Sequence, residues 1–312
     1  MGKIAFLFPG QGSQQVGMGR ELAEVSEQVK EYFDKADQVL EESLSATIFE
    51  GPQDKLTLTV NAQPALLTTS IAILDYFKKS GIEADFVAGH SLGEYSALVA
   101  AGALHFEDGV YAVRKRGELM EKAVPNGEGT MAAVLGLDRD SLTAVCEAVT
   151  AAGNSVQLAN LNCPGQIVIS GSRKGVEEAS VKAKEAGAKR VLPLNVSGPF
   201  HSELMKPAAV EFKDILNGIQ VDSAKIPVIA NVTAEPMQDA EEIKEKLIEQ
   251  LYSPVLWEDT VGKMIELGVD TFIEIGPGKV LAGLVRKVDR SVKTLAVYDV
   301  ESCEAAISAL KE

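Results

Sequence analysis

The residues with the clearest chemical potential form the sequence Gly89-His90-Ser91-Leu92-Gly93, which fits the pattern G-x-S-x-G. A strand pattern precedes it and a helix pattern follows, the context in which G-x-S-x-G forms a nucleophile elbow. In such an elbow the hydroxyl of Ser91 is exposed beside a helix N-terminus, and the N–H of Leu92 can stabilise a developing oxyanion. A pattern this short also arises by chance, but the strand-turn-helix context favours an activated serine nucleophile.

An activated serine needs a base within hydrogen-bonding reach, and the chain has three histidines. His90 neighbours the serine within the elbow, and we expect the turn to point it elsewhere. His105 follows a helix pattern and is expected to be structural or exposed. His201 lies in a turn after a predicted strand, downstream of Ser91 as in α/β-hydrolases. His201 is therefore the predicted base, the alternative being a capping or core histidine.

The third member of such a site, which would orient His201, has no clear candidate. Acidic residues are plentiful between positions 91 and 201, but none stands in a recognisable loop at a strand end. A backbone or amide carbonyl can also fix the tautomer of an imidazole. The residues alone leave this part of the site open.

Two glycine-rich loops follow predicted strands. The loop 8–14 fails as a dinucleotide-binding loop because no glycine stands at the required third position. An N–H near Gln11 could instead be the second oxyanion donor beside Leu92, the alternative being a plain tight turn. The loop 275–279 fails as a Walker loop because Val280 replaces the Ser or Thr that binds Mg²⁺, so we expect a strand-to-helix turn.

Three consecutive cations, Arg114, Lys115 and Arg116, stand on the predicted helix after the elbow helix. A run of cations on a helix is usually a solvated face. One arginine turned into the site would instead bind a substrate carboxylate through two hydrogen bonds, which a lysine would do less well. Spacing alone only suggests an inward arginine.

The elements that must position these residues alternate between strand and helix patterns, which predicts an α/β fold. The predicted strands outside the middle of the chain are 4–8, 85–88, 226–231, 271–275 and 294–297. The predicted helices there are 63–79, 92–101, 107–123, 243–251, 255–267, 280–288 and 301–310. Ser91 thus follows the second of these strands.

The segment 128–195 has a different order of elements. Its strands are expected at 131–137, 156–162, 166–170 and 190–194, with helices at 140–151 and 176–186. The resulting order βαββαβ is that of a ferredoxin-like subdomain. Turn-rich flanks at 125–127 and 197–199 indicate that this segment is inserted into the larger α/β unit.

Composition excludes several classes of function. The chain has 312 residues and a formal net charge of −15, whereas nucleic acids and anionic membranes require clustered positive charge. No apolar run approaches the roughly 18 residues of a membrane span, and the N-terminal one is too short for a signal peptide. Cys146, Cys163 and Cys303 lack zinc-site spacing and indicate a reducing compartment. We therefore expect a cytoplasmic protein that binds neither nucleic acid nor membrane.

Over essentially its whole length the chain resembles the malonyl-CoA:acyl carrier protein transacylase family of bacterial type II fatty-acid synthesis. Seven motifs in order carry the resemblance: Phe8-Pro9-Gly10-Gln11-Gly12-Ser13-Gln14, Asn61-Ala62-Gln63-Pro64-Ala65, Gly89-His90-Ser91-Leu92-Gly93-Glu94-Tyr95, Arg116-Gly117, Asn160-Leu161-Asn162-Cys163-Pro164-Gly165-Gln166, Pro199-Phe200-His201-Ser202 and Glu249-Gln250-Leu251. The resemblance implies an α/β-hydrolase-like core with a mostly parallel sheet over 1–127 and 196–312. It also implies an inserted ferredoxin-like subdomain over 128–195.

The resemblance also implies roles for matching positions. Ser91 would carry the acyl group and His201 would be its base, oriented by the main-chain carbonyl of Gln250. The N–H groups of Gln11 and Leu92 would form the oxyanion hole.

Substrate recognition follows from the same resemblance. Arg116 would bind the free malonyl carboxylate. Phe200 resembles the residue of malonyl-selective members and would crowd an α-methyl group. Gln63, Asn160 and Asn162 match motif positions near the cleft.

The implied reaction moves a malonyl group from malonyl-CoA through a malonyl-serine ester to holo-acyl carrier protein, with no metal or dissociable cofactor. A monomer is expected. A serine hydrolase with the same Ser91 and His201 is the main alternative, since the motifs alone do not separate transfer to thiol from transfer to water. A transacylase serving polyketide synthesis, or a non-catalytic docking module, are the others.

Overall fold

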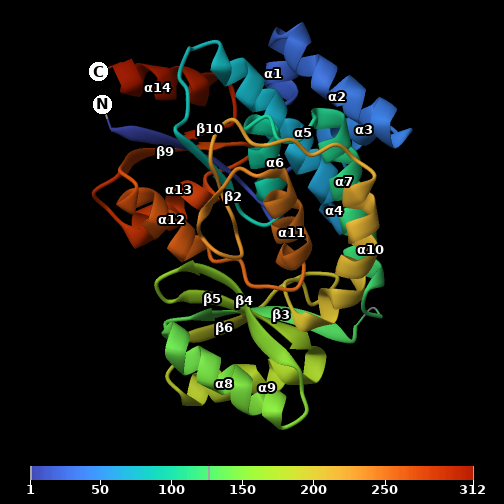
Figure 1. The fold of residues 1–312 in the computed structure, drawn as a ribbon, viewed down its shortest axis with the longest axis vertical. Helices are drawn as coiled ribbons and strands as arrows, with labels where there is room; N and C mark the ends of the chain where they lie inside the picture. The colour runs from blue at the N-terminus through green and yellow to red at the C-terminus, as the bar shows by residue number, and fades with distance from the viewer. Residues whose placement is uncertain (1, 126, 312) are drawn as a thin grey trace.

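The computed structural model describes residues 2–125 and 127–311 and contains two β-sheets flanked by helices (Figure 1). The larger sheet and most of the helices form one unit. The smaller sheet lies below it in the view of Figure 1, with its own pair of helices. The predicted α/β class, with a mostly parallel sheet and a separate antiparallel one, is confirmed.

The larger sheet consists of β1 (Lys3–Phe8), β2 (Phe86–Gly89), β7 (Val228–Ile229), β8 (Pro236–Met237), β9 (Val269–Ile275) and β10 (Lys293–Val297). Their order across the sheet is β10-β9-β1-β2-β7-β8. All neighbours pair in parallel except β7 and β8. The carboxyl ends of β1, β2, β7 and β9 therefore meet at one edge, where α/β folds usually build their sites.

Both faces of this sheet are covered, which explains the continuous apolar runs in its strands. In β1, Phe6 and Phe8 pack into the cluster that contains α5 (Thr59–Lys78) and α6 (Gly93–Ala100). Ala5 and Leu7 point to the other face, into the cluster formed with α12 (Trp257–Glu266) and α13 (Val280–Val288).

The remaining helices of this unit extend the layers on either side. They are α1 (Arg20–Val25), α2 (Glu27–Leu40), α3 (Leu44–Glu50), α4 (Gln53–Thr57), α7 (Phe106–Lys122), the 3₁₀ helix η1 (Glu203–Met205), α10 (Lys206–Asn217), α11 (Ala240–Gln250) and α14 (Val300–Lys311). Within the described residues, none of the helices combines the length and apolar character that crossing a bilayer requires.

The smaller sheet has the predicted βαββαβ order of elements. It comprises β3 (Gly129–Leu135), β4 (Val156–Cys163), β5 (Gln166–Ser172) and β6 (Arg190–Pro193), with α8 (Arg139–Ala151) and α9 (Arg173–Glu185). The strand order is β4-β5-β3-β6 and every pair is antiparallel. Asn126, in the first of the turn-rich flanks, lies outside the described residues, and the division at 128 and 195 stays a prediction.

The two faces of the smaller sheet pack against different partners. One face, with Val134 and Ile169, packs against α8 and α9 in a cluster of its own. The opposite face, with Met131, Ala159 and Val168, joins the main core cluster. Side chains of the smaller sheet are thereby brought to the carboxyl edge of the larger sheet.

Two local differences from the sequence expectations concern the first hundred residues. The helix expected at 63–79 begins at Thr59, because the Leu58 carbonyl accepts from the N–H groups of Asn61 and Ala62 and so starts the first turn. Pro64 consequently lies inside α5 rather than in its first turn. The four helices between Arg20 and Thr57, of which α2 has 14 residues and the other three are short, had no counterpart among the predicted elements.

Candidate active site

Ser91 lies in a sharp turn between the end of β2 and the start of α6. Its φ of 51° is in the left-handed region, which costs a non-glycine residue about 1–3 kcal/mol. The flanking glycines permit this turn. A Cβ at Gly89 would lie 1.9 Å from the Gly93 carbonyl, and one at Gly93 would lie 2.0 Å from the carbonyl oxygen of Phe8.

His201 lies in the loop between β6 and η1 and is 3% exposed. Its Nε2 is 2.7 Å from Ser91 Oγ, and its Nδ1 is 2.8 Å from the main-chain oxygen of Gln250. A carbonyl oxygen only accepts hydrogen bonds, so Nδ1 must carry the proton. Nε2 is then free to accept the hydrogen of the serine hydroxyl.

The environment of His201 keeps its imidazole neutral. Burial, followed by the positive charge of Arg116, lowers the pKa of His201 from 6.5 to about 3. The Gln250 carbonyl acts in the opposite direction by accepting a hydrogen bond from the ring. The imidazole is therefore neutral at neutral pH, with Nε2 unprotonated, the form in which it can remove a proton from Ser91.

Arg116 is the inward cation of the predicted run. It lies on the buried stripe of α7 together with Val113 and Met120, and it is 1% exposed. Its guanidinium donates to Gln63 Oε1 at 2.7 Å and to Gln250 Oε1 at 2.8 Å.

The same guanidinium reaches the predicted nucleophile. Arg116 Nη2 lies 3.1 Å from Ser91 Oγ, so a positive charge stands directly beside the serine hydroxyl. Within residues 2–125 and 127–311, Arg116 forms no ion pair with a carboxylate. Its charge remains available for a bound anion.

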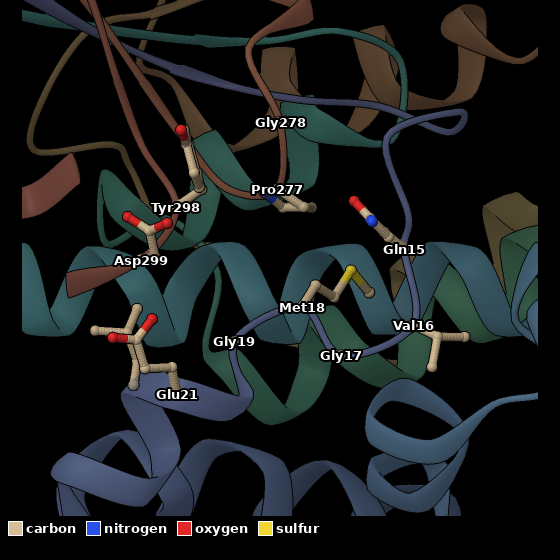
Figure 2. A pocket seen from close by; sticks show the side chains of 11 residues that line it. Gln15, Val16, Gly17, Met18, Gly19, Glu21, Pro277, Gly278, Tyr298 and Asp299 are labelled. Carbon is tan, nitrogen blue, oxygen red and sulfur yellow. The ribbon is translucent and has the colours of Figure 1, made fainter. Parts of the chain in front are cut away.

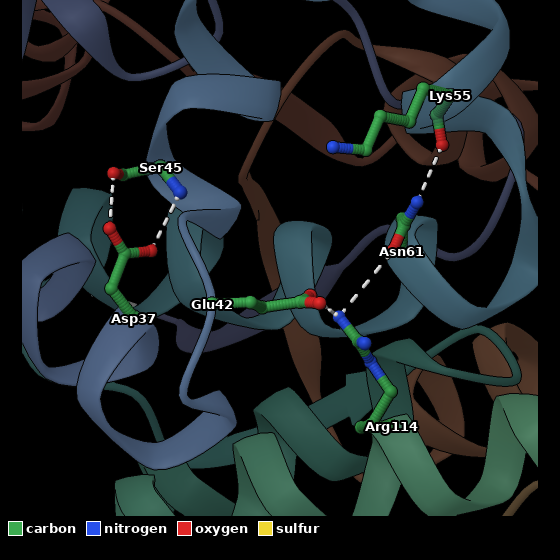
Figure 3. A network of polar contacts seen from close by, with 6 residues as sticks. All are labelled: Asp37, Glu42, Ser45, Lys55, Asn61 and Arg114. Carbon is green, nitrogen blue, oxygen red and sulfur yellow. Dashed lines mark hydrogen bonds and ion pairs between the residues drawn. The ribbon is translucent and has the colours of Figure 1, made fainter.

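Arg114, two residues earlier on α7, points to the other side of the helix. Figure 3 shows its side chain between Glu42, with which it forms an ion pair, and Asn61. Asn61 in turn donates to the main-chain oxygen of Lys55 at 2.8 Å. This network joins α7 to the chain before α3 and to α5, and Arg114 takes no part in the site.

Gln11 and Leu92, whose main-chain N–H groups are the predicted oxyanion donors, line the same cavity as Ser91. Among the hydrogen bonds of residues 2–125 and 127–311, neither N–H has an acceptor. Gln11 is held by its side chain, whose Nε2 donates to Thr59 Oγ1 at 3.0 Å. The close approach of Gly10 to the His90 carbonyl oxygen, 2.3 Å from where a Cβ would stand, brings this loop against the elbow.

A cavity of about 280 Å³ opens beside Ser91 and His201. Its walls come from the larger unit, the smaller sheet and the segment that joins them: Gln11, Gly12, Gln14, Thr57, His90, Ser91, Leu92, Arg116, Met120, Met131, Asn160, Leu194, Asn195, Val196, Phe200 and His201. Phe200 is buried and is one of the residues that line this space. Gln63 is not among the lining residues, but it accepts a hydrogen bond from the guanidinium of Arg116.

His90, which we expected to point away from the nucleophile, is also part of the cavity wall. Its Nε2 is 2.8 Å from Asn162 Oδ1, and its ring packs against that of Trp257 with the two planes tilted by 56°. It is thus bonded to the smaller sheet rather than to Ser91. His105 is exposed just before α7, as expected.

A second cavity of similar volume lies elsewhere along the carboxyl edge of the larger sheet (Figure 2). Residues 15–19 form one wall, and Pro277, Gly278, Tyr298 and Asp299 form the other. None of the predicted site residues lines it. Within the described residues, no group of three or more His, Cys, Asp or Glu side chains is arranged to hold a metal ion.

Two buried polar residues beside Ser91 were not among the predicted site residues. Asn231 accepts a hydrogen bond from the N–H of Ser91 through Oδ1 at 2.7 Å. Glu94, 1% exposed, accepts from the N–H of Asn231 and from Gln250 Nε2. Burial raises the pKa of Glu94 from 4.5 to about 7, against the effects of these donors and of Arg116. A polar residue at the end of an apolar strand pattern was the available signal for Asn231.

Comparison with known proteins identifies the family. Residues 5–307 match the acyl transferase domain family. The chain is 65% identical over 312 residues to the malonyl CoA-acyl carrier protein transacylase of Bacillus subtilis strain 168, covering 100% of this chain and 98% of that protein. The crystal structure of an acyl carrier protein S-malonyltransferase from Vibrio cholerae has 46% identity and a TM-score of 0.95, covering 97% of this chain and 99% of that one.

A third relative was solved with a protein partner. This malonyl transacylase in complex with its type II polyketide synthase acyl carrier protein has 44% identity and a TM-score of 0.96 over 98% of this chain and 99% of that one. The resemblance drawn from seven sequence motifs is therefore confirmed. The chain belongs to the malonyl-CoA:acyl carrier protein transacylase family of acyl transferases.

Proposed function

We propose that this chain transfers the malonyl group of malonyl-CoA to the phosphopantetheine thiol of holo-acyl carrier protein, through an ester on Ser91. The observation that carries the proposal is the buried guanidinium of Arg116, 3.1 Å from Ser91 Oγ. A malonyl thioester has a free carboxylate at the far end of its acyl group. Arginine is well suited to bind it because its planar fork matches a carboxylate with two hydrogen bonds.

In the first half-reaction, Ser91 Oγ attacks the thioester carbonyl while its proton passes to Nε2 of His201. The 2.7 Å contact between these atoms supports this transfer. The carbonyl oxygen becomes an oxyanion that the free N–H groups of Gln11 and Leu92 stabilise. The C–S bond then breaks, coenzyme A leaves as the thiol with the proton from His201, and the malonyl ester of Ser91 remains.

The second half-reaction repeats these steps with the carrier as nucleophile. The phosphopantetheine thiol gives its proton to His201 and its sulfur attacks the ester carbonyl. Ser91 Oγ leaves and regains the proton from His201. The Gln250 carbonyl keeps His201 in the same tautomer and orientation for both halves, in the position that an acid occupies in a catalytic triad. No metal or dissociable cofactor takes part.

We further propose several assignments at the periphery of this reaction. Phe200 limits substitution at the α-carbon of the acyl group, and Gln63 fixes Arg116. Asn160 lines the approach from β4, and Asn162 holds His90 at the cavity wall. The unit 128–195 is an inserted subdomain of an α/β-hydrolase-like core formed by 1–127 and 196–312. The protein acts as a monomer in the cytoplasm, in fatty-acid synthesis.

Intact mass spectrometry tests the proposed function. The protein is mixed with malonyl-CoA, with and without holo-acyl carrier protein. We expect a single malonyl adduct that is absent in the Ser91→Ala variant and moves to the carrier when the carrier is added. An adduct that decays to free malonate at the same rate with or without carrier would instead establish a hydrolase. Comparing fatty-acid and polyketide carriers as acceptors tests the assigned process.

A further inference from the structure

The nucleophile is fixed by more than its glycines, because two buried amide side chains hold both sides of the Ser91 peptide. Asn231 Oδ1 accepts from the N–H of Ser91 at 2.7 Å, and Asn231 Nδ2 donates to the Gly89 carbonyl at 2.7 Å. Gln250 Nε2 donates to the Ser91 carbonyl at 3.0 Å. The single carboxamide of Asn231 thus spans the elbow from Gly89 to Ser91.

Asn231 reaches this position because of the sheet order. It stands two residues beyond β7, and β7 pairs with β2 through Val228 and Val87. The loop after β7 therefore lies beside the elbow after β2. Asn231 is fully buried, so its hydrogen bonds to the elbow are made without competition from water.

The orientation of Asn231 is itself fixed by a neighbour on α6. Its backbone N–H donates to Glu94 Oε1 at 3.1 Å, and the other carboxyl oxygen of Glu94 accepts from Gln250 Nε2. Gln250 also accepts from Arg116 through its side chain and from His201 through its main chain. One buried network therefore joins the nucleophile, the base and the candidate carboxylate-binding arginine.

We propose that Asn231, oriented by Glu94, is a positioning residue that holds Ser91 in its left-handed backbone conformation. By occupying the Ser91 N–H, it leaves the adjacent N–H of Leu92 directed into the cavity for the oxyanion. Asn231 touches no reacting atom and acts through the elbow. The proposal rests on the acyl transfer proposed above.

The first test is the Asn231→Ala variant, assayed by quenched-flow mass spectrometry for the rate of malonyl-Ser91 formation. We expect this rate to fall on the order of 100-fold, the effect of misplacing a reacting group by about an ångström. The Kd of malonyl-CoA, measured in a Ser91→Ala background with and without Asn231→Ala, should stay unchanged. A purely structural role would lower the folded fraction and not the rate of the folded enzyme.

Asn61→Ala is the matched control. Asn61 is also a buried asparagine, and its carboxamide also bonds a backbone carbonyl, but in the network of Figure 3. This variant should lose stability and keep the acylation rate. Acylation of Asn231→Ala at the wild-type rate would overturn the positioning role while leaving the transfer intact. Failure of the wild-type protein to form the adduct would overturn the proposed function instead.

The second test is the Asn231→Asp variant, which replaces one amide by a carboxyl of the same shape. The protonated carboxyl can accept from Ser91 and donate to the Gly89 carbonyl, whereas the ionised form puts negative charge against that carbonyl and against Glu94. The other titratable groups in this network are Arg116, His201 and, on the cavity wall, His90. Dividing each rate by the wild-type rate at the same pH removes their own titrations.

The acylation rate of Asn231→Asp relative to wild type should rise at least tenfold between pH 8 and pH 5.5. The relative rate of Asn231→Ala should stay flat over this range, because alanine cannot restore either hydrogen bond. If Asn231→Ala does not fold, the pH dependence of Asn231→Asp decides alone. A flat ratio for Asn231→Asp would refute the proposal.

Discussion

Removing the guanidinium beside the nucleophile should lower malonyl transfer far more than acetyl transfer. Arg116 is 1% exposed and bonds only neutral amides and the serine hydroxyl in the described part of the chain. In Arg116→Ala, a malonyl carboxylate would enter the same cavity without a partner. Breaking a buried charge pair in this way costs about 3–5 kcal/mol. At 1.36 kcal/mol per decade, kcat/KM for malonyl-CoA should fall about 10²- to 10⁴-fold.

The ratio of two substrates isolates this effect from damage to the fold. Arg116→Ala leaves the buried Oε1 atoms of Gln63 and Gln250 without their donor, and each such loss destabilises the protein by about 1–3 kcal/mol. A smaller folded fraction lowers malonyl and acetyl transfer equally. Acetyl-CoA has no carboxylate, so the malonyl-to-acetyl ratio should fall by nearly the full 10²- to 10⁴-fold.

The assay is the rate of acyl-enzyme formation from malonyl-CoA and from acetyl-CoA, followed by intact mass in a rapid-quench instrument. Arg114→Ala is the matched control, since it removes an arginine from the same helix that pairs with Glu42 outside the site. Its selectivity should match wild type. An Arg116→Ala enzyme with an unchanged malonyl-to-acetyl ratio would refute the assignment of the carboxylate to Arg116.

Three further predictions concern the base, the cavity wall and the elbow. Because the pKa of folded His201 is about 3 against 6.5 in the unfolded chain, the unfolded state gains the proton first as pH falls, and stability is lost. From pH 6.5 to pH 5 the free energy of unfolding, measured in urea, should fall about 2 kcal/mol more for wild type than for His201→Asn. An equal fall in the two proteins would contradict a buried neutral imidazole. Phe200→Ser should raise the rate of methylmalonyl transfer relative to malonyl transfer about 10- to 200-fold in competition assays. An unchanged ratio would show that Phe200 does not determine this selectivity. Gly93→Ala puts a Cβ 2.0 Å from the Phe8 carbonyl oxygen, so it should lower the stability by about 1–3 kcal/mol and remove most of the acylation rate. Acylation at the wild-type rate would show that the elbow can shift without loss.

Local patterns predicted the parts of the site that depend on local geometry. The nucleophile elbow is encoded by glycines within two residues of Ser91, so the pattern and its strand-turn-helix context were enough. Helices such as α5 and α7 are long, and the fold class followed from the alternation of strand and helix patterns along the chain. His201 could be singled out because the chain has only three histidines.

Contacts between distant segments were much harder to predict. The acceptor that orients His201 is a main-chain oxygen, which any residue could supply, so Gln250 came only from family resemblance. The inward orientation of Arg116 could have been predicted from its spacing. Arg116 falls three residues after Val113 and four before Met120, on the apolar stripe of α7, whereas Arg114 falls off that stripe.

Asn231 illustrates the limit of reasoning from residue types. It was the last residue of a predicted strand, but its role depends on β7 lying beside β2, and a two-residue strand carries little pattern of its own. The short helices α1, α3 and α4 were missed for a similar reason, because helices of five to seven residues depend on tertiary packing rather than on their own periodicity. α2 has 14 residues, and the spacing of its buried Val29, Phe33 and Ala36 was a usable signal for a helix.

The atoms that hold the nucleophile in place differ from those that we expect to determine acyl selectivity. Gly10, Gly89 and Gly93 bring the first loop, the elbow and α6 together through main-chain atoms. Other residues of the cavity wall, such as Met131 and Phe200, make no hydrogen bond to Ser91 in the described part of the chain. Mutations can therefore reshape the space for the acyl group while the reacting atoms keep their places. A fold built in this way can acquire new acyl substrates one wall residue at a time.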